Sequence, residues 1–286
     1  MIAGTAWPIA LLTLVLSQPA GEDASASVDS DAQLMGALRQ YYLQEASAYD
    51  FFLDAEHQKP LTLQTKPLMH WGMLDGWSGA IYVWTCDGRP QLIGCIGSGL
   101  ESNHRRSVFH EFHSLSEQPL APIKINGARQ WQWSPEGAGA KLREFPDAPA
   151  PRSSPILRRS QMRSLAQQFS AEIGNEPLRL MPRPLYQFGS EEGSQCEGAI
   201  FAFALAEGTD PELLVLLERR KVESEQHWFY APARFSNREM RLKLQGQEVW
   251  QVERYGEQWQ TNRPKQSYLT VWIKWVTMDE IKSAGE

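Results

Sequence analysis

The 286-residue sequence has few cysteines, little charge imbalance and only one long hydrophobic run. Its three cysteines, Cys86, Cys95 and Cys196, are too few for a disulfide framework. They form no CxxC pair and no histidine pair lies near them at ligand spacing, so no zinc site is predicted and the thiols are expected to be buried and inert. The formal net charge of −6 is modest and dispersed, which argues against a nucleic-acid-binding protein that neutralises phosphates.

Motifs for cofactors and for nucleophilic catalysis are missing as well. The sequence contains no glycine-rich phosphate loop, Walker motif or dinucleotide fingerprint. No serine or cysteine lies in a nucleophile elbow. With 42% hydrophobic and 22% charged residues, the composition is typical of a globular protein, and no cofactor is predicted.

The long hydrophobic run, IAGTAWPIALLTLVL, is at the N-terminus and is followed by the small, polar segment SQPAGEDASAS. This order is typical of a secretory signal and a flexible linker, to which we assign residues 1–30. The nearby A-x-A cleavage pattern is Ala24-Ser25-Ala26, so a secreted or periplasmic protein is predicted. No Lys or Arg precedes the run and Pro8 interrupts it, which leaves an uncleaved N-terminal anchor as the alternative. No later stretch is apolar for long enough to span a bilayer.

The two halves of the chain resemble each other. PLTLQTKPLMHW at 60–71 and PLRLMPRPLYQF at 177–188 share Pro and Leu positions at a constant offset of 117 (177 − 60). GAIYVW from Gly79 parallels GAIFAF from Gly198, and IKINGARQW ending at Trp131 parallels LKLQGQEVW ending at Trp250. A helix-like pattern precedes each set, which indicates an internal duplication.

Each copy is predicted to be a helix, an extended segment, a β-hairpin and two further strands, with turns at DGRP, GTDP, NG and QG. This pattern favours an α+β fold of two tandem copies, residues 31–143 and 157–286, in which a helix packs on an antiparallel β-sheet. A pseudo-twofold axis is expected to relate the copies. Residues 144–156, rich in proline and small residues, are a predicted linker. The last strand, 267–275, has no partner in the first copy, and it either completes a sheet edge or crosses to the other copy.

The stretch VFHEFHSLS at 108–116 has two histidines and a glutamate in four positions. Alternate strand residues share a face, so His110 and Phe112 are predicted to point one way and Glu111 and His113 the other. Histidines on opposite faces do not chelate one ion, so no metal site is predicted. At the offset of 117, His110 aligns with His227, which predicts equivalent structural positions for these two residues.

Glu111 and His113 are the candidate catalytic residues, because a carboxylate beside an imidazole orients the ring and raises its pKa. Asp87 and Arg89, in the predicted hairpin turn, are the other charged groups that could converge on this pair. The pair supports a hydrolase-like enzyme. A hydrogen-bonded structural pair is the competing interpretation.

The sequence contains eleven tryptophans. Trp131, Trp133, Trp228 and Tyr230 are candidate ligand-binding residues, because exposed aromatic rings stack on sugars or contact partner proteins. Core filling is the alternative for each ring. The predicted function is a non-catalytic binding module for a protein or a surface glycan, with a hydrolase-like enzyme and a structural component of an envelope assembly as alternatives.

The segments QYYLQEASAYDFFLDAEHQKPLTL, WTCDGRPQLIG, HEFHSLS, FPDAPAP and GTDPELLVLLE together resemble an uncharacterised family of predicted secreted proteins of planctomycete-type bacteria. The resemblance covers roughly residues 34–255. It implies an exported bacterial protein and assigns no activity, cofactor or residue role.

Overall fold

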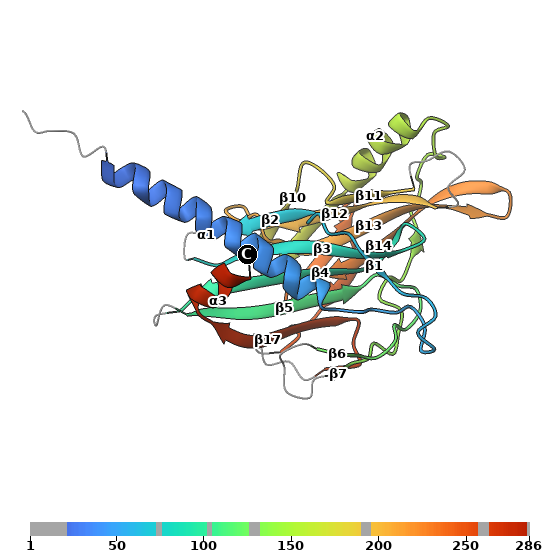
Figure 1. Cartoon of the computed structure of the whole chain (residues 1–286). Helices are drawn as coiled ribbons and strands as arrows, with labels where there is room; N and C mark the ends of the chain where they lie inside the picture. The colour runs from blue at the N-terminus through green and yellow to red at the C-terminus, as the bar shows by residue number, and fades with distance from the viewer. Residues whose placement is uncertain are drawn as a thin grey trace, which may run out of the picture.

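The protein is mostly β-structure, with seventeen strands and three helices in the part of the chain that the structure describes. The computed structural model describes residues 22–72, 76–101, 105–125, 132–189, 196–256 and 263–284, with side chains from residue 32 onward. Two large antiparallel sheets face each other, and helices cover their outer surfaces (Figure 1). The predicted signal segment before residue 22 lies outside the described residues, and the predicted cleavage pattern lies in the first turns of a helix.

The first sheet has six strands in the order β1-β3-β4-β5-β17, with β2 also paired to β3. The helix α1 (Glu22–Ser47) crosses its outer face, beside the short C-terminal helix α3 (Met278–Ser283) (Figure 1). The bounds of the strands are β1 (Thr62–Leu63), β2 (Met69–Gly72), β3 (Ser78–Cys86), β4 (Arg89–Leu100), β5 (Arg106–Ser114) and β17 (Tyr268–Val276).

The second sheet has nine strands in the order β16-β15-β9-β10-β12-β13-β14-β8, with β11 also paired to β12, and it curves into a half-barrel. The helix α2 (Pro155–Ala166) packs on its outer face through Met162 and Leu165. The bounds of these strands are β8 (Arg143–Glu144), β9 (Phe169–Ile173), β10 (Glu176–Leu180), β11 (Tyr186–Phe188), β12 (Glu197–Ala204), β13 (Pro211–Val222), β14 (Glu225–Arg234), β15 (Met240–Leu244) and β16 (Gln247–Val252). A separate two-stranded ribbon joins β6 (Ile123–Lys124) to β7 (Gln132–Trp133).

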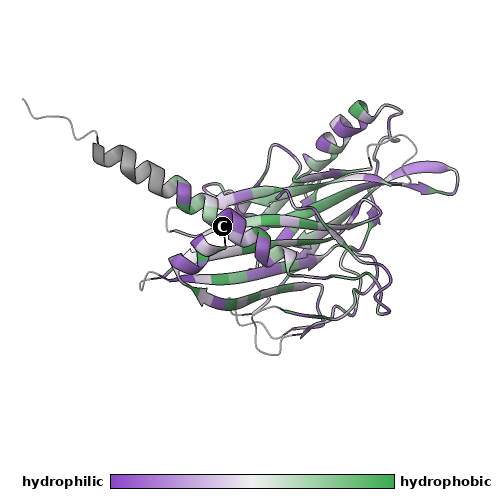
Figure 2. Cartoon of the chain, viewed as in Figure 1, coloured by the Kyte–Doolittle hydropathy of each residue, from purple (hydrophilic) through white to green (hydrophobic). Residues whose placement is uncertain are grey.

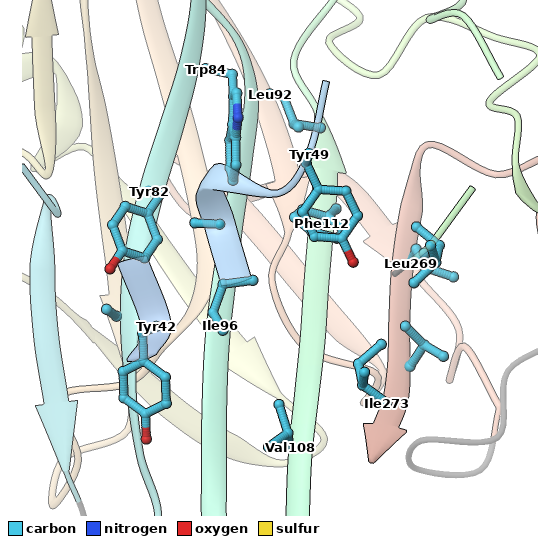
Figure 3. Close-up of a cluster of buried hydrophobic side chains, with 14 of the residues drawn as sticks. Tyr42, Tyr49, Tyr82, Trp84, Leu92, Ile96, Val108, Phe112, Leu269 and Ile273 are labelled. Atoms are coloured by element: carbon cyan, nitrogen blue, oxygen red, sulfur yellow. The ribbon is translucent and has the colours of Figure 1, made fainter. Parts of the chain in front are cut away.

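The central strands of the first sheet are buried on both faces, which explains their nearly continuous apolar sequence. Hydrophobic residues concentrate along these strands, whereas hairpin tips and loops are hydrophilic (Figure 2). On the outer face, Tyr42 of α1 and Tyr49 beyond it lie over Trp84, Ile96 and Phe112 (Figure 3). The Tyr42 hydroxyl also bonds the Ser78 and Ser98 hydroxyls, at 2.8 and 2.7 Å, so it fixes the helix to β3 and β4.

The inner faces of the two sheets form a shared core. This core explains why alternate residues of β3 and β4 are apolar on the face that points away from α1. It is built from Ile81, Ile93, Cys95 and Phe109 of the first sheet and Ile200, Ala202, Leu214 and Leu216 of the second.

The prediction of an α+β fold made of two helix-on-sheet copies is wrong. The meanders β2–β5 and β11–β14 do share one pairing order, with Trp71 opposite Gly79 and Phe188 opposite Gly198. The second sheet, however, adds β9, β10, β15 and β16, and the first sheet takes β17 instead. The similarity between the two halves of the sequence reflects the meander that both sheets share. It does not specify which further strands complete each sheet.

The last strand of the chain crosses to the first sheet. β17 pairs with β5, and α3 contacts α1, so residues from both halves of the sequence build one layer.

The segment predicted to be a linker begins in a strand of the second sheet, since β8 pairs with β14 through Arg143 with Tyr230 and Glu144 with Phe229. No helix in the described part of the chain is long and apolar enough to cross a membrane.

Candidate functional site

A cavity of about 730 Å³ lies between the two sheets, where β5 and β17 face the start of β13. β5 contributes Phe109 and Glu111, which alternate toward the interior, and β17 contributes Tyr268 and Thr270. The second sheet closes the opposite side. From this side the cavity is lined by Gly174, Asp210, Glu212, Phe235, Ser236, Asn237, Arg238, Glu239 and Arg254.

Aromatic rings form one wall of this cavity, and glycines allow them to lie close to the sheet. A Cβ atom on Gly97 would be 2.4 Å from the Phe109 ring, and one on Gly99 would be 2.3 Å from the Trp77 ring. The Phe109 ring centroid is 5.9 Å from that of Trp77 and 6.3 Å from that of Trp71. The three rings therefore pack as one cluster beside the carboxyl groups.

Carboxyl groups on both sheets approach each other in the cavity. Burial raises the pKa of Glu111 to about 8, although Tyr268 donates a hydrogen bond to its Oε1. Burial also raises the pKa of Asp210 well above its usual range, with the nearby Glu111 as the next cause. The pKa of Glu212 is raised by burial as well, despite a hydrogen bond with Ser236. Glu111 is therefore mostly protonated at neutral pH, which makes it a hydrogen-bond donor as well as an acceptor.

Glu111 and His113 point to the same face of β5, as the strand period predicts, but they do not form a pair. His113 lines a second cavity, of about 230 Å³, and Tyr268 is its neighbour on β17. Burial lowers the pKa of His113 to about 4, so its imidazole is neutral at pH 7. No hydrogen bond or ion pair joins the two residues. A carboxylate that orients an imidazolium is therefore not present here.

Asp87 and Arg89 lie away from both cavities. Asp87 occupies the β3–β4 turn with a φ of 49°. Arg89 is buried and joins the two sheets, because its Nη2 lies 3.0 Å from Glu218 Oε2 and 3.6 Å from Glu117 Oε1. Its role is structural.

The predicted aromatic ligand-binding residues are in the core where the structure describes them. Trp133 is fully buried and donates a 2.8 Å hydrogen bond from Nε1 to the Gln266 carbonyl. Trp228 and Tyr230 are buried under the second sheet, and Trp131 lies outside the described residues. The rings that line the cavity, Trp71 and Trp77 among them, were not predicted, because their position depends on glycines on neighbouring strands.

The two histidines aligned by the sequence repeat have different environments. His110 is fully buried, with Nδ1 2.6 Å from the Tyr49 hydroxyl and Nε2 3.4 Å from Glu45 Oε2. His227 is one-third exposed at a hairpin end, with Nδ1 2.7 Å from Glu144 Oε1.

The strand register explains why the alignment of the histidines is wrong. Gly97 pairs with Phe109 in the first sheet, and Glu218 pairs with Phe229 at the matching place in the second. The offset there is 120 (229 − 109), three more than the 117 of the sequence alignment. The structural counterpart of His110 is therefore Tyr230.

The cysteines and acidic residues give no sign of a metal centre in the part of the chain that is described. Cys95 is buried, Cys86 and Cys196 are half-buried, and all three are free thiols. No group of three or more His, Cys, Asp or Glu side chains in that part is arranged to hold a metal ion.

Comparisons with protein-family models, curated proteins and solved structures find no match to this chain. The functional interpretation therefore depends on the geometry of the two cavities.

Proposed function

We propose that this chain is an exported binding protein whose 730 Å³ cavity holds a polyhydroxylated ligand, such as the end of a glycan. The observation that carries the proposal is an aromatic wall that faces a group of carboxyls in one cavity between two sheets. The C–H faces of sugar rings pack on aromatic rings, and carboxyl oxygens bind the hydroxyl groups at the edge of the sugar. A cavity of this volume is in the usual range for small-molecule sites.

The protonation state of Glu111 in the cavity also suits a neutral ligand. A protonated Glu111 donates to one hydroxyl oxygen and accepts from another, and it adds no buried charge. Arg238 and Arg254 at the cavity supply further donors, and Arg238 is held 3.1 Å from Glu176. Donors and acceptors therefore occur together, which matches the mixed character of sugar hydroxyls.

Export is part of the same proposal. The N-terminal hydrophobic run and the polar segment after it support a cleaved signal, with the mature N-terminus between Pro19 and Val28. Deletion of residues 1–26 should then retain the protein in the cytoplasm. N-terminal sequencing of exported material that begins at Met1 would contradict cleavage and support an anchor.

Glycan binding is tested by screening the mature protein against a glycan array and measuring each hit by isothermal titration calorimetry. Trp77→Ala and Glu212→Gln should each weaken binding about tenfold or more, because they remove one ring and one carboxylate from the cavity. Glu248→Gln, an exposed change on β16 outside the cavity, is the matched control. The proposal fails if both cavity variants bind as the wild-type protein does.

One observation supports a hydrolase as the second candidate. Glu111 is protonated near neutral pH and shares its cavity with Asp210 and Glu212, and a pair of carboxyl groups of which one acts as the acid hydrolyses glycosidic bonds. Mass spectrometry of ligands incubated with the protein would detect cleavage. Cleavage that persists in Glu111→Gln would exclude Glu111 as the acid.

A further inference from the structure

Tyr268 lines both cavities, and the smaller one has the opposite electrostatic character. This 230 Å³ cavity lies where β5 and β17 of the first sheet meet β14 and β16 of the second. Lys141, Arg143 and Arg234 line it, and none of its described lining residues is acidic. The cavity therefore has three cationic side chains and no carboxylate to balance them.

Arg234 is the buried cation of this cavity, with only 7% of its surface exposed. It donates to three backbone carbonyls at 2.8–3.1 Å and lies over the rings of Tyr255 and Tyr268. Within the described residues, no carboxylate is close enough to form an ion pair with it. A buried guanidinium whose hydrogen-bond and ring partners are neutral keeps an attractive field for an anion.

His113 provides a second, independent indication of a ligand. It is 4% exposed and lines the cavity, and neither ring nitrogen makes a hydrogen bond of normal geometry, although the carbonyls of Gly139 and Arg234 are close. An imidazole without a well-formed partner is unfavourable in a buried position. A ligand oxygen in the cavity would accept from the ring N–H in a better geometry than either carbonyl offers.

We propose that this cavity binds a small oxyanion, held by Lys141, Arg143 and Arg234 and by a hydrogen bond from His113. Guanidinium groups bind carboxylate and phosphate oxygens through paired N–H donors. Arg143 donates Nη1 to the Val249 carbonyl, which positions its guanidinium at the cavity while other N–H groups stay available. The site is separate from the glycan cavity, so either proposal can fail alone.

The test uses the mature protein and two probes, inorganic phosphate and acetate, at constant ionic strength. Calorimetry should show millimolar or tighter binding of at least one probe, and NMR should show a saturable shift of the His113 ring signals. Lys141→Gln/Arg143→Gln should weaken binding about tenfold or more, because both cations are lost. Both residues are exposed, so the double variant should retain its melting temperature.

The matched control is Arg159→Gln/Lys221→Gln, which removes the same charge from exposed positions outside the cavity. It should bind the anion as the wild-type protein does. Equal losses in the two double variants would show a general charge effect and overturn the site. Absence of a saturable His113 shift with both probes would overturn it as well, whereas the relative strength of phosphate and acetate identifies the oxyanion.

Discussion

The raised pKa of Glu111 has a measurable consequence for stability. Glu111→Gln keeps the size of the side chain and an Oε1 atom that accepts the hydrogen bond from Tyr268. It removes the ability of the residue to lose a proton. The variant therefore isolates the ionisation of one buried carboxyl from the packing around it.

The sign of the effect follows from the direction of the pKa shift. The folded protein retains the Glu111 proton up to about pH 8, whereas the unfolded chain releases it near pH 4.5. The contribution to stability is complete below pH 4.5 and is lost as pH rises toward 8. A shift of this size corresponds to about 5 kcal/mol, which is an upper limit because Glu111 is partly exposed to solvent, which screens its charge.

His113 acts in the opposite direction. Its pKa is lowered from 6.5 to about 4, so its contribution is present above pH 6.5 and is lost as the pH falls toward 4. Between pH 4.5 and 6.5 the two residues oppose each other in the wild-type protein. Removing the Glu111 carboxyl should therefore expose the His113 dependence, and the variant should gain stability as the pH rises through this range.

Urea unfolding at several pH values between 4.5 and 8 measures the difference between Glu111→Gln and wild type. The free energy of unfolding of the variant should increase relative to wild type by several kcal/mol across this window. Glu248→Gln, at an exposed site, should show no such trend. A difference that is constant with pH, or that decreases, would refute the reasoning.

Three further substitutions test the polar contacts that fix the two sheets. Glu218→Gln should lower the free energy of unfolding by about 3–5 kcal/mol in urea denaturation, because it leaves the buried Arg89 without its 3.0 Å carboxylate partner. His110→Ala should lower it by about 1–3 kcal/mol, because the buried Tyr49 hydroxyl loses its 2.6 Å partner. His227→Ala, at a one-third exposed position, should cost less than about 1 kcal/mol, and equal losses for the two histidines would contradict the assignment of their environments.

Local structure was readily predicted from the sequence. The period-two pattern in VFHEFHSLS gives the strand β5 and the correct faces for Glu111 and Phe112. The turn Asp87-Gly88, within the predicted DGRP sequence, separates β3 from β4. These features depend on neighbouring residues alone, so one chain segment contains the necessary information.

Sheet assembly and the cavities were not predicted, because they depend on contacts between distant segments. Nothing in the sequence of β17 indicates that its partner is β5 rather than a strand of the second half. The carboxyl cluster joins Glu111 to Asp210 and Glu212, about one hundred residues later, through the packing of two sheets. The sequence repeat also gave a wrong alignment of the histidines. Residue types match at an offset of 117, whereas the paired strands correspond at an offset of 120.

The pairing of β17 with β5 also determines the order in which the protein can fold during synthesis. Val271 pairs with His110, a separation of 161 residues (271 − 110), so the first sheet lacks its edge strand until these 161 residues have been synthesised. Until then, β5 presents an open edge and α1 has no α3 beside it. A nascent chain therefore cannot complete its first layer, or close either cavity, before residues 268–276 have left the ribosome.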